Sequence, residues 1–362
     1  MKKTLKAKTK RVVQKKSVKA APGKKAVPLV APKSGRPSAV GSKTGTAKSA
    51  KPRVAPRESA AKPAGAASAI SSAGKPGSVR IFQIYYHDEH QQALDPAFVP
   101  YDSGGNPSEL QEFAVFENLA QNGKVAGAQY WGALSWRFHE KTGMSGKEWL
   151  AAMAARPGFD AYFCNPHPNF EALYQNLWVR GEVALPSFML VARAFFEAAG
   201  LPVERLMALQ PASTFASANY FVATPSFWEA YLRFVRRAID NAERRMPSRI
   251  RVLLHSKQAD PDGDHFGATY LPFIVERLFA EFLATDGAAF KVSKVPLPAR
   301  EKEMDGHMRL LREMKDVACK TKSIWMASCW VNYRNVYLGQ TRGLEWCNKY
   351  LPSMTPVEAK FA

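Results

Sequence analysis

The sequence predicts an α/β domain with a mostly parallel sheet, preceded by a basic segment that adds nothing to that domain's core. From residue 79 onward, short apolar and β-branched segments alternate with amphipathic segments of helical length. Parallel strands need crossover connections of this kind, so the alternation favours a largely parallel sheet. The composition changes sharply near residue 78, because residues 1–77 hold 20 Lys and Arg, one acid and no aromatic residue.

Charge divides the chain at the same place. The 362 residues include 51 Lys and Arg and 31 Asp and Glu, which leaves 31 bases and 30 acids after residue 77. This near-neutral balance argues against a nucleic-acid-binding body. The tail, defined as residues 1–77, is expected to be disordered and rich in Lys, Ala and Pro, since it cannot bury enough apolar surface to offset its chain entropy.

The tail resembles the extended basic tails of histone-like proteins, which bind polyanions by counterion release. We therefore expect it to bind nucleic acid or another polyanion. A solubilising extension, and a targeting segment or wrongly extended start, remain as alternatives. No transmembrane segment is expected in the body, because charged residues interrupt its most apolar stretch, residues 183–203. The four cysteines lack metal-binding spacing and are expected to be reduced thiols.

Periodicity and capping residues place the elements of the body. Helix starts are indicated near Asn106, at Ser145 and at Thr224, and Gly200 suits a helix C-cap. Strands are expected at residues 79–86, 127–134, 159–164, 218–223, 251–255 and 290–295. Helices are expected at residues 106–119, 145–156, 169–179, 187–199, 224–239, 270–283 and 301–319, and the aromatic residues after 324 are expected to cover one face.

The common catalytic signatures are missing from the sequence. It has no Gly-X-Ser-X-Gly elbow, no Walker loop and no Gly-X-Gly-X-X-Gly turn after the first strand, which argues against an α/β-hydrolase, a P-loop enzyme and a conventional nicotinamide dehydrogenase. In open α/β sheets, ligands bind outside the carboxyl ends of the strands. The residues that follow each expected strand are therefore the candidates for a site.

Five segments of the body share a recognisable pattern. They are Tyr85-Tyr86-His87-Asp88-Glu89, residues 132–138 with 140–145, residues 159–166, Asn219-Tyr220-Phe221-Val222-Ala223 before Pro225, and Glu276-Arg277. Together they resemble a family of bacterial proteins from polysaccharide-synthesis loci that is similar to glycosyltransferases of the GT-A type. The resemblance covers residues 79–286.

The resemblance implies a GT-A-like, Rossmann-like domain over residues 78–300 and a helical, aromatic extension over residues 301–362 that packs on it. It implies a hexosyltransferase-type enzyme that moves a sugar from a nucleotide-sugar donor to a glycan or polysaccharide acceptor. The expected location is cytoplasmic, with peripheral association at the inner membrane face as an alternative. Stereochemical inversion and retention are both left open.

Metal dependence is in doubt, because the strand that ends in Asp-X-Asp in metal-dependent members ends here in Phe163-Cys164-Asn165-Pro166-His167. The sequence therefore leaves open whether a divalent metal ion is a cofactor. Alternative partners for the diphosphate are Arg137, Lys141, Arg180 or Lys257. Residues 260–264 contain Asp-X-Asp in a glycine-containing loop. An exposed turn and a metal site are both interpretations of that loop.

The resemblance and the strand ends together give the candidate site residues. The carboxylates expected to act in catalysis are Asp88, Asp160 and Glu276, and those expected to bind substrate are Tyr85, His87, Trp136, Arg137, Asn165, His167, Asn219 and Arg277. Structural alternatives stand beside them: a solvated loop at residues 87–90, a loop hydrogen bond for His167, core packing for Trp136, and a buried ion pair for Glu276 with Arg277.

Two further function classes compete with sugar transfer. The body could be a non-catalytic carbohydrate-binding or assembly module tethered to polyanions by the tail, which the missing Asp-X-Asp favours. A DNA-associated protein driven by the tail is the third hypothesis. The alternation of strands and helices and the polar strand ends favour the enzyme.

Overall fold

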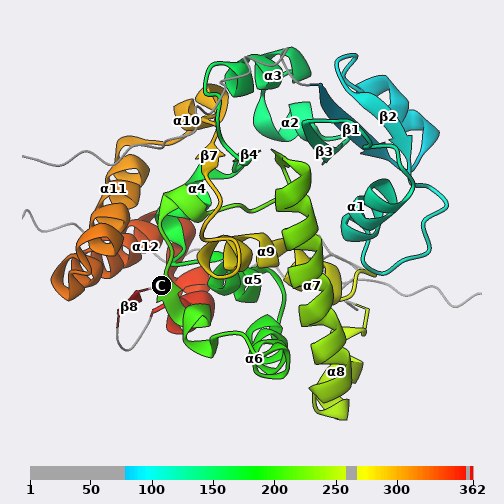
Figure 1. Ribbon diagram of the computed structural model, residues 1–362. Coiled ribbons are helices and arrows are strands. Elements are labelled where there is room, and N and C mark those ends of the chain that lie inside the picture. Colours follow the sequence, from blue (N-terminus) through cyan, green and yellow to red (C-terminus); the bar gives the residue numbers. More distant parts are fainter. Residues whose placement is uncertain (1–77, 258–266, 356–358, 362) are drawn as a thin grey trace, which may run out of the picture. The chain divides into compact units, whose positions relative to one another are not determined.

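The computed structural model describes residues 78–257, 267–355 and 359–361, so the expected disordered tail and the Asp-X-Asp loop at residues 260–264 lie outside the described residues. The described chain forms a six-stranded α/β sheet with helices on both faces (Figure 1). The strands are β1 (Val79–Tyr85), β2 (Val99–Asp102), β3 (Tyr130–Ser135), β4 (Ala161–Phe163), β6 (Phe221–Ala223) and β7 (Val292–Lys294).

The sheet has the order β2-β1-β3-β6-β4-β7 and is parallel except for β6. The expected mostly parallel sheet is therefore confirmed. Because β6 runs backwards between β3 and β4, the residues just before it lie at the same edge as the residues just after its neighbours. That edge, the carboxyl edge, thus receives Asn219 and Tyr220 as well as the segments that follow β1, β3 and β4.

Alternating side chains of the strands divide the core between the two faces of the sheet, as a period of two requires. Phe82 and Ile84 of β1 pack on the face covered by α1 (Glu112–Gln121), α6 (Phe188–Ala199), α7 (Pro225–Arg245) and α9 (Leu271–Ala284). Ile81 packs on the other face, with Phe138 of α2 (Phe138–Thr142) and Trp149 of α3 (Gly146–Ala154). Both faces are buried, as expected for a parallel sheet.

Several caps lie where the sequence indicates them. Ser145 and Glu148 form a reciprocal capping box at α3, the Thr224 side chain accepts from the backbone N–H of Phe227 at the start of α7, and Gly200 ends α6 with φ 75°. The start of the first helix differs. Residues 106–108 are irregular, residues 109–111 form a turn, and α1 begins only at Glu112, after Gln111 at φ 48°.

The strand expected at residues 251–255 is wrong. This segment belongs to α8 (Ser248–Leu254), in which Leu254 is fully buried and Val252 is 69% exposed. The apolar run is short enough to suit either period, and packing of Leu254 in the core decides for the helix. Strand β2 is missing from the sequence expectations because it is a short edge strand with Pro100 inside it.

The chain from residue 298 onward forms helices, and the last two of them pack on α4 (Pro168–Leu173) and α5 (Leu177–Ala184), respectively. They are α10 (Pro298–Lys302), α11 (Gly306–Thr321) and α12 (Ile324–Met354), the last with non-helical geometry at Gly343. A second, two-stranded sheet pairs β5 (Ala208–Leu209) with β8 (Lys360–Phe361). The short 3-10 helices are η1 (Asp88–Ala93), η2 (Val203–Met207) and η3 (Ala212–Thr214).

Candidate functional site

Three neighbouring cavities of about 730, 230 and 130 Å³ form a groove along the carboxyl edge. Lys141 and His167 line both the first and the second cavity, and Glu276 lines both the second and the third. We call this the edge groove. Its walls come from α2 after β3, from the loop between β4 and α4, from the segment before β6, and from α9.

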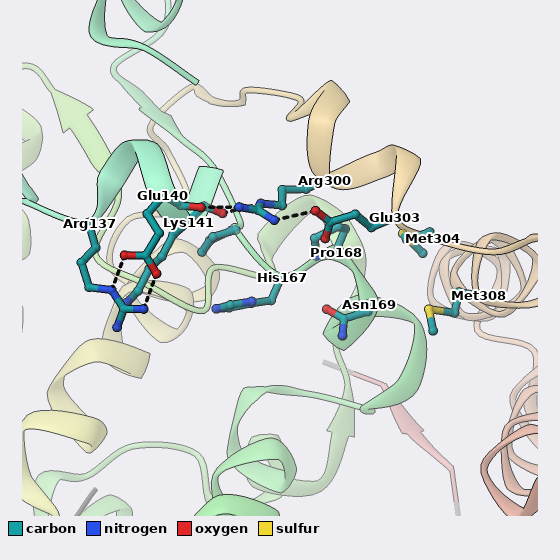
Figure 2. Close-up of a pocket in the computed structure, with 11 residues that line it drawn as sticks. Arg137, Glu140, Lys141, His167, Pro168, Asn169, Arg300, Glu303, Met304 and Met308 are labelled. Atoms are coloured by element: carbon teal, nitrogen blue, oxygen red, sulfur yellow. Dashed lines mark hydrogen bonds and ion pairs between the residues drawn. The ribbon is translucent and has the colours of Figure 1, made fainter. Parts of the chain in front are cut away.

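The largest cavity is lined by alternating charges (Figure 2). Arg137 donates from Nε and an Nη atom to the carboxylate of Glu140 at 2.8 and 2.5 Å, and Arg300 donates to Glu303 Oε1 at 2.5 Å. Arg300 also holds α2 in place, because its Nε donates to the backbone O of Lys141 at 2.7 Å. Arg137 and Arg300 therefore already have carboxylate partners.

Lys141 and Arg180 differ from those two arginines. The Lys141 ammonium has no hydrogen bond or carboxylate partner among the described residues and lies 5.9 Å from the Tyr220 ring. Arg180 lies over the rings of Phe170 and Tyr174 at 4.5 and 5.6 Å, and its buried Nε has no partner within the described part of the chain. Both line the second cavity with His167. Two positive charges that form no direct ion pair with a described residue make this cavity suited to an anion.

His167 follows β4 and stacks on the Phe170 ring at 4.7 Å. Burial lowers its pKa to about 4, and the positive charges of Lys141, Arg180, Arg300 and Arg137 add to that shift. The imidazole is therefore neutral at physiological pH, and a bound anion would raise its pKa by offsetting those charges.

Glu276 on α9 carries the strongest sign of acid–base chemistry in the groove. Burial raises the pKa of its carboxyl group to about 7, and the nearby Glu112 raises it further, while Arg277, Lys141 and Arg180 oppose the shift. Its side chain is still 28% exposed, so a ligand in the groove can reach it. A carboxylate with a pKa near neutrality suits a general base.

Glu112 and Asn219 complete the third cavity with Glu276. Asn219 Nδ2 donates to Glu112 Oε2 at 2.9 Å, while the buried Asn219 Oδ1 has no partner within the residues that the structure describes. Burial raises the pKa of Glu112 as well. Two carboxyl groups and an unsatisfied amide oxygen thus face the same small cavity, which favours binding of a hydrogen-bond donor such as a hydroxyl group.

Asn165 organises the site without facing the groove. Its side chain, in a residue only 3% exposed, accepts from Ser217 Oγ at 2.5 Å and the backbone N–H of His167 at 3.3 Å. It donates to Glu171 Oε1 at 2.5 Å and to the backbone O of His167 at 3.1 Å. Every polar atom of the amide is used in shaping the His167 loop, so the structure gives Asn165 a positioning role in place of the expected contact with substrate.

Arg277 lines the second cavity but is held by the protein. It donates to the backbone O atoms of Leu177 and Phe273 at 3.0 and 2.6 Å, lies 4.8 Å from the Phe188 ring, and approaches Glu276 to 3.9 Å. Burial lowers its pKa to about 10. These contacts agree with the ion-pair interpretation of Glu276 and Arg277, with Arg277 as the anchored partner.

Asp160 is not brought to the groove. It precedes β4, so it lies at the opposite edge of the sheet, where its Oδ2 accepts from the backbone N–H of Lys291 at 2.8 Å. The structure therefore does not bring Asp160, which was expected to act in catalysis, to the same site as Glu276. A residue before a parallel strand and one after it are separated by the length of that strand.

The residues after β1 also lie outside the three cavities of the groove. Asp88 is exposed and accepts from Gln91 at 3.2 Å, His87 is exposed, and Tyr85 lines a separate cavity next to Asp95. Trp136 is half-buried, with the ring of His90 stacked on it at 3.9 Å. Through Trp136 this cluster adjoins Arg137, whose guanidinium lies 5.9 Å from the indole ring. Lys257 is exposed and lines none of these cavities.

Sequence reasoning missed Glu112, Ser217 and Arg300. Glu112 is hidden in the sequence because the capping pattern draws attention to Glu109, three residues earlier, whose Oε2 instead accepts from His255 Nδ1 at 2.7 Å. Ser217 and Arg300 reach the site only through tertiary contacts with Asn165 and Lys141. Only the position of Ser217 shortly before an expected strand could have drawn attention to it.

Comparison with family models, with curated proteins and with solved structures finds no match for this chain. Within the described residues, no group of three or more His, Cys, Asp and Glu side chains is arranged to hold a metal ion. No helix in the described part of the chain has the length and apolar character needed to cross a membrane.

Proposed function

We propose that the edge groove binds a nucleotide-sugar through its diphosphate and transfers the sugar to a glycan acceptor, with Glu276 as the general base. The observation that carries the proposal is the placement of Lys141 and Arg180, neither of which has a direct ion-pair partner among the described residues, in the same cavity as a carboxylate whose pKa is raised to about 7. An anionic leaving group and a base for the acceptor hydroxyl are the two needs of glycosyl transfer.

The three cavities suggest where each part of the substrates would bind. The diphosphate would lie against Lys141 and Arg180, where neutral His167 supplies a further hydrogen bond. The acceptor hydroxyl would lie near Glu276 and the free oxygen of Asn219. Glu276 takes the proton from that hydroxyl as the acceptor oxygen bonds to the anomeric carbon and the bond to the diphosphate breaks, with the electron pair leaving on the phosphate oxygen.

Titration calorimetry with uridine, guanosine and cytidine diphosphates tests the anion site. Lys141→Ala and Arg180→Ala should each weaken binding about tenfold or more, since a hydrogen bond to a charged group contributes about 1.5–3 kcal/mol. Arg233→Ala is the matched control, because Arg233 is an exposed arginine of α7 paired with Glu229. Absence of binding by all three nucleotides would remove the proposal.

Turnover separates the enzyme from a binding module. Sugar-nucleotide hydrolysis or transfer should be lost in Glu276→Gln while diphosphate binding is retained, and the wild-type rate should rise with pH through about 7 as Glu276 loses its proton. Nucleotide binding without any turnover would favour the non-catalytic carbohydrate-binding or assembly module.

A further inference from the structure

The tightest turn between the C-terminal helices exposes two large apolar side chains. Only Lys322, at φ 54°, and Ser323 separate α11 from α12, and the Ser323 side chain caps α12 by accepting from the backbone N–H of Met326 at 3.2 Å. In the first turn of α12, Ile324 is 54% exposed and Trp325 is 84% exposed. No other large apolar side chain in the described residues is more exposed than Trp325. We call residues 320–325 the hairpin tip.

The hairpin tip is cationic as well as apolar. Residues 317–344 contain no Asp or Glu, and Lys320 and Lys322 lie within the tip. Lys322 lies 5.5 Å from the ring of Phe361 in β8, next to exposed Lys360. This charge complements an anionic surface and repels a second copy of the same tip.

The chemistry of these side chains suits the headgroup region of a bilayer. Tryptophan has an apolar body and a polar N–H, and lysine extends an apolar stem with a charged end, which is why both gather at membrane interfaces. Two side chains on one helical turn are too few for a stable protein interface, which buries about 800 Å² per partner. They are sufficient for shallow insertion when basic residues supply electrostatic attraction.

We propose that the hairpin tip docks the protein on an anionic lipid surface, with Ile324 and Trp325 inserted and Lys320 against the lipid phosphates. The tail, with 20 Lys and Arg, adds attraction to the same kind of surface. Stable peripheral binding commonly needs two such signals together.

Tryptophan quenching by brominated lipids tests the proposal on the full chain. Vesicles of phosphatidylcholine and phosphatidylglycerol with brominated acyl chains should quench part of the emission, and Trp325→Phe should abolish that quenching. Of the seven other tryptophans, Trp136 and Trp346 are half-buried and the remaining five are fully buried: Trp131, Trp149, Trp178, Trp228 and Trp330. The tail holds no tryptophan, so attachment through the tail alone leaves the emission unquenched.

Vesicle sedimentation measures the contribution to affinity. The double variant Ile324→Ser, Trp325→Ser should weaken binding about tenfold or more, because apolar burial of the two side chains is lost. Leu190→Ser is the matched control, since Leu190 lies on α6 and is 52% exposed, close to the value for Ile324. Vesicles of phosphatidylcholine alone should bind weakly.

Three results would overturn the proposal. They are absence of binding to the anionic vesicles, quenching that persists unchanged in Trp325→Phe, and a dimer in solution that Trp325→Ser dissociates. The last would assign the tip to a second copy of the chain.

Discussion

The surroundings of Glu276 stabilise the protonated form of its carboxyl group. A carboxyl group on the buried side of α9, beside a second carboxyl group, holds its proton up to a pKa of about 7 although Arg277 and Lys141 favour the charged form. The native state therefore binds this proton more tightly than the unfolded chain does. Stabilisation by the proton is present below pH 4.5 and is lost as the pH rises through 7.

Glu276→Gln should remove this pH dependence. Each pKa unit corresponds to about 1.4 kcal/mol, so the variant should gain on the order of 3 kcal/mol of unfolding free energy over wild type when the pH rises from 4.5 to above 7. Urea unfolding across this range measures the difference. Glu229→Gln, at a carboxylate that is 74% exposed, is the control and should show little change. Parallel curves for Glu276→Gln and wild type would refute the shift.

Glu171 shows a different use of a buried charge. It is 1% exposed, and it joins the His167 loop to β7 because Oε1 accepts from Asn165 at 2.5 Å and from Lys294 Nζ at 2.5 Å. Arg312 of α11 approaches its other oxygen to 3.7 Å. A buried carboxylate held by two cations and an amide positions the loop.

At the scale of elements, the reversed strand β6 depends on a close approach to β3. A Cβ atom at Gly132 would lie 2.6 Å from the backbone O of Phe221 and 2.8 Å from Val222 Cγ2. Only glycine leaves room for this pairing, which in turn places Asn219 at the groove.

Gly132→Ala should therefore destabilise the protein by about 1–3 kcal/mol through overpacking. Gly339→Ala is the opposite case, because no atom lies within 4 Å of its added Cβ and Gly339 lies inside α12. Gly339→Ala should stabilise the protein by about 0.5–1 kcal/mol, as expected for glycine replaced by alanine within a helix. Thermal and denaturant unfolding measure both, and equal stability of the two variants would contradict the packing argument.

The C-terminal helices reach the site through α4. Lys315 of α11 is fully buried, donates to the backbone O of Tyr174 at 2.8 Å, and has its pKa lowered to about 8 by burial. Trp330 of α12 donates to the backbone O of Ala172 at 3.0 Å. These contacts hold α4 and α5, the helices that carry His167 and Arg180, so the C-terminal helices stabilise this wall of the edge groove.

At the scale of the whole molecule, positive charge is concentrated in the tail while residues 78–362 are near neutral. Deletion of residues 1–77 should abolish salt-sensitive binding to DNA and other polyanions and should leave the far-UV circular dichroism of the body unchanged. The full chain is the reference, and its log affinity should fall steeply with log salt. Salt-sensitive DNA binding by the truncated protein would contradict this division of charge.

Local signals were enough for much of the fold. Capping residues and apolar periodicity gave α3, α6, the start of α7 and the strands β1, β3 and β4 to within a few residues, because these depend on neighbours in sequence, whereas α7 continues six residues past its expected end at residue 239. β2, β5 and β8 were missed, since such short strands are defined only by their partners. Residues 251–255 were given to a strand because a short apolar run does not reveal its period.

Composition and periodicity are local properties, so they suffice to show that a near-neutral α/β body with polar strand ends follows a basic tail. Which polar residues meet depends on long-range packing. The strand direction sends Asp160 to the far edge and brings Asn219 to the groove, and packing of α1 against α9 places Glu112 beside Glu276. These are long-range contacts, and the charge and burial that shift the Glu276 pKa exist only once they have formed.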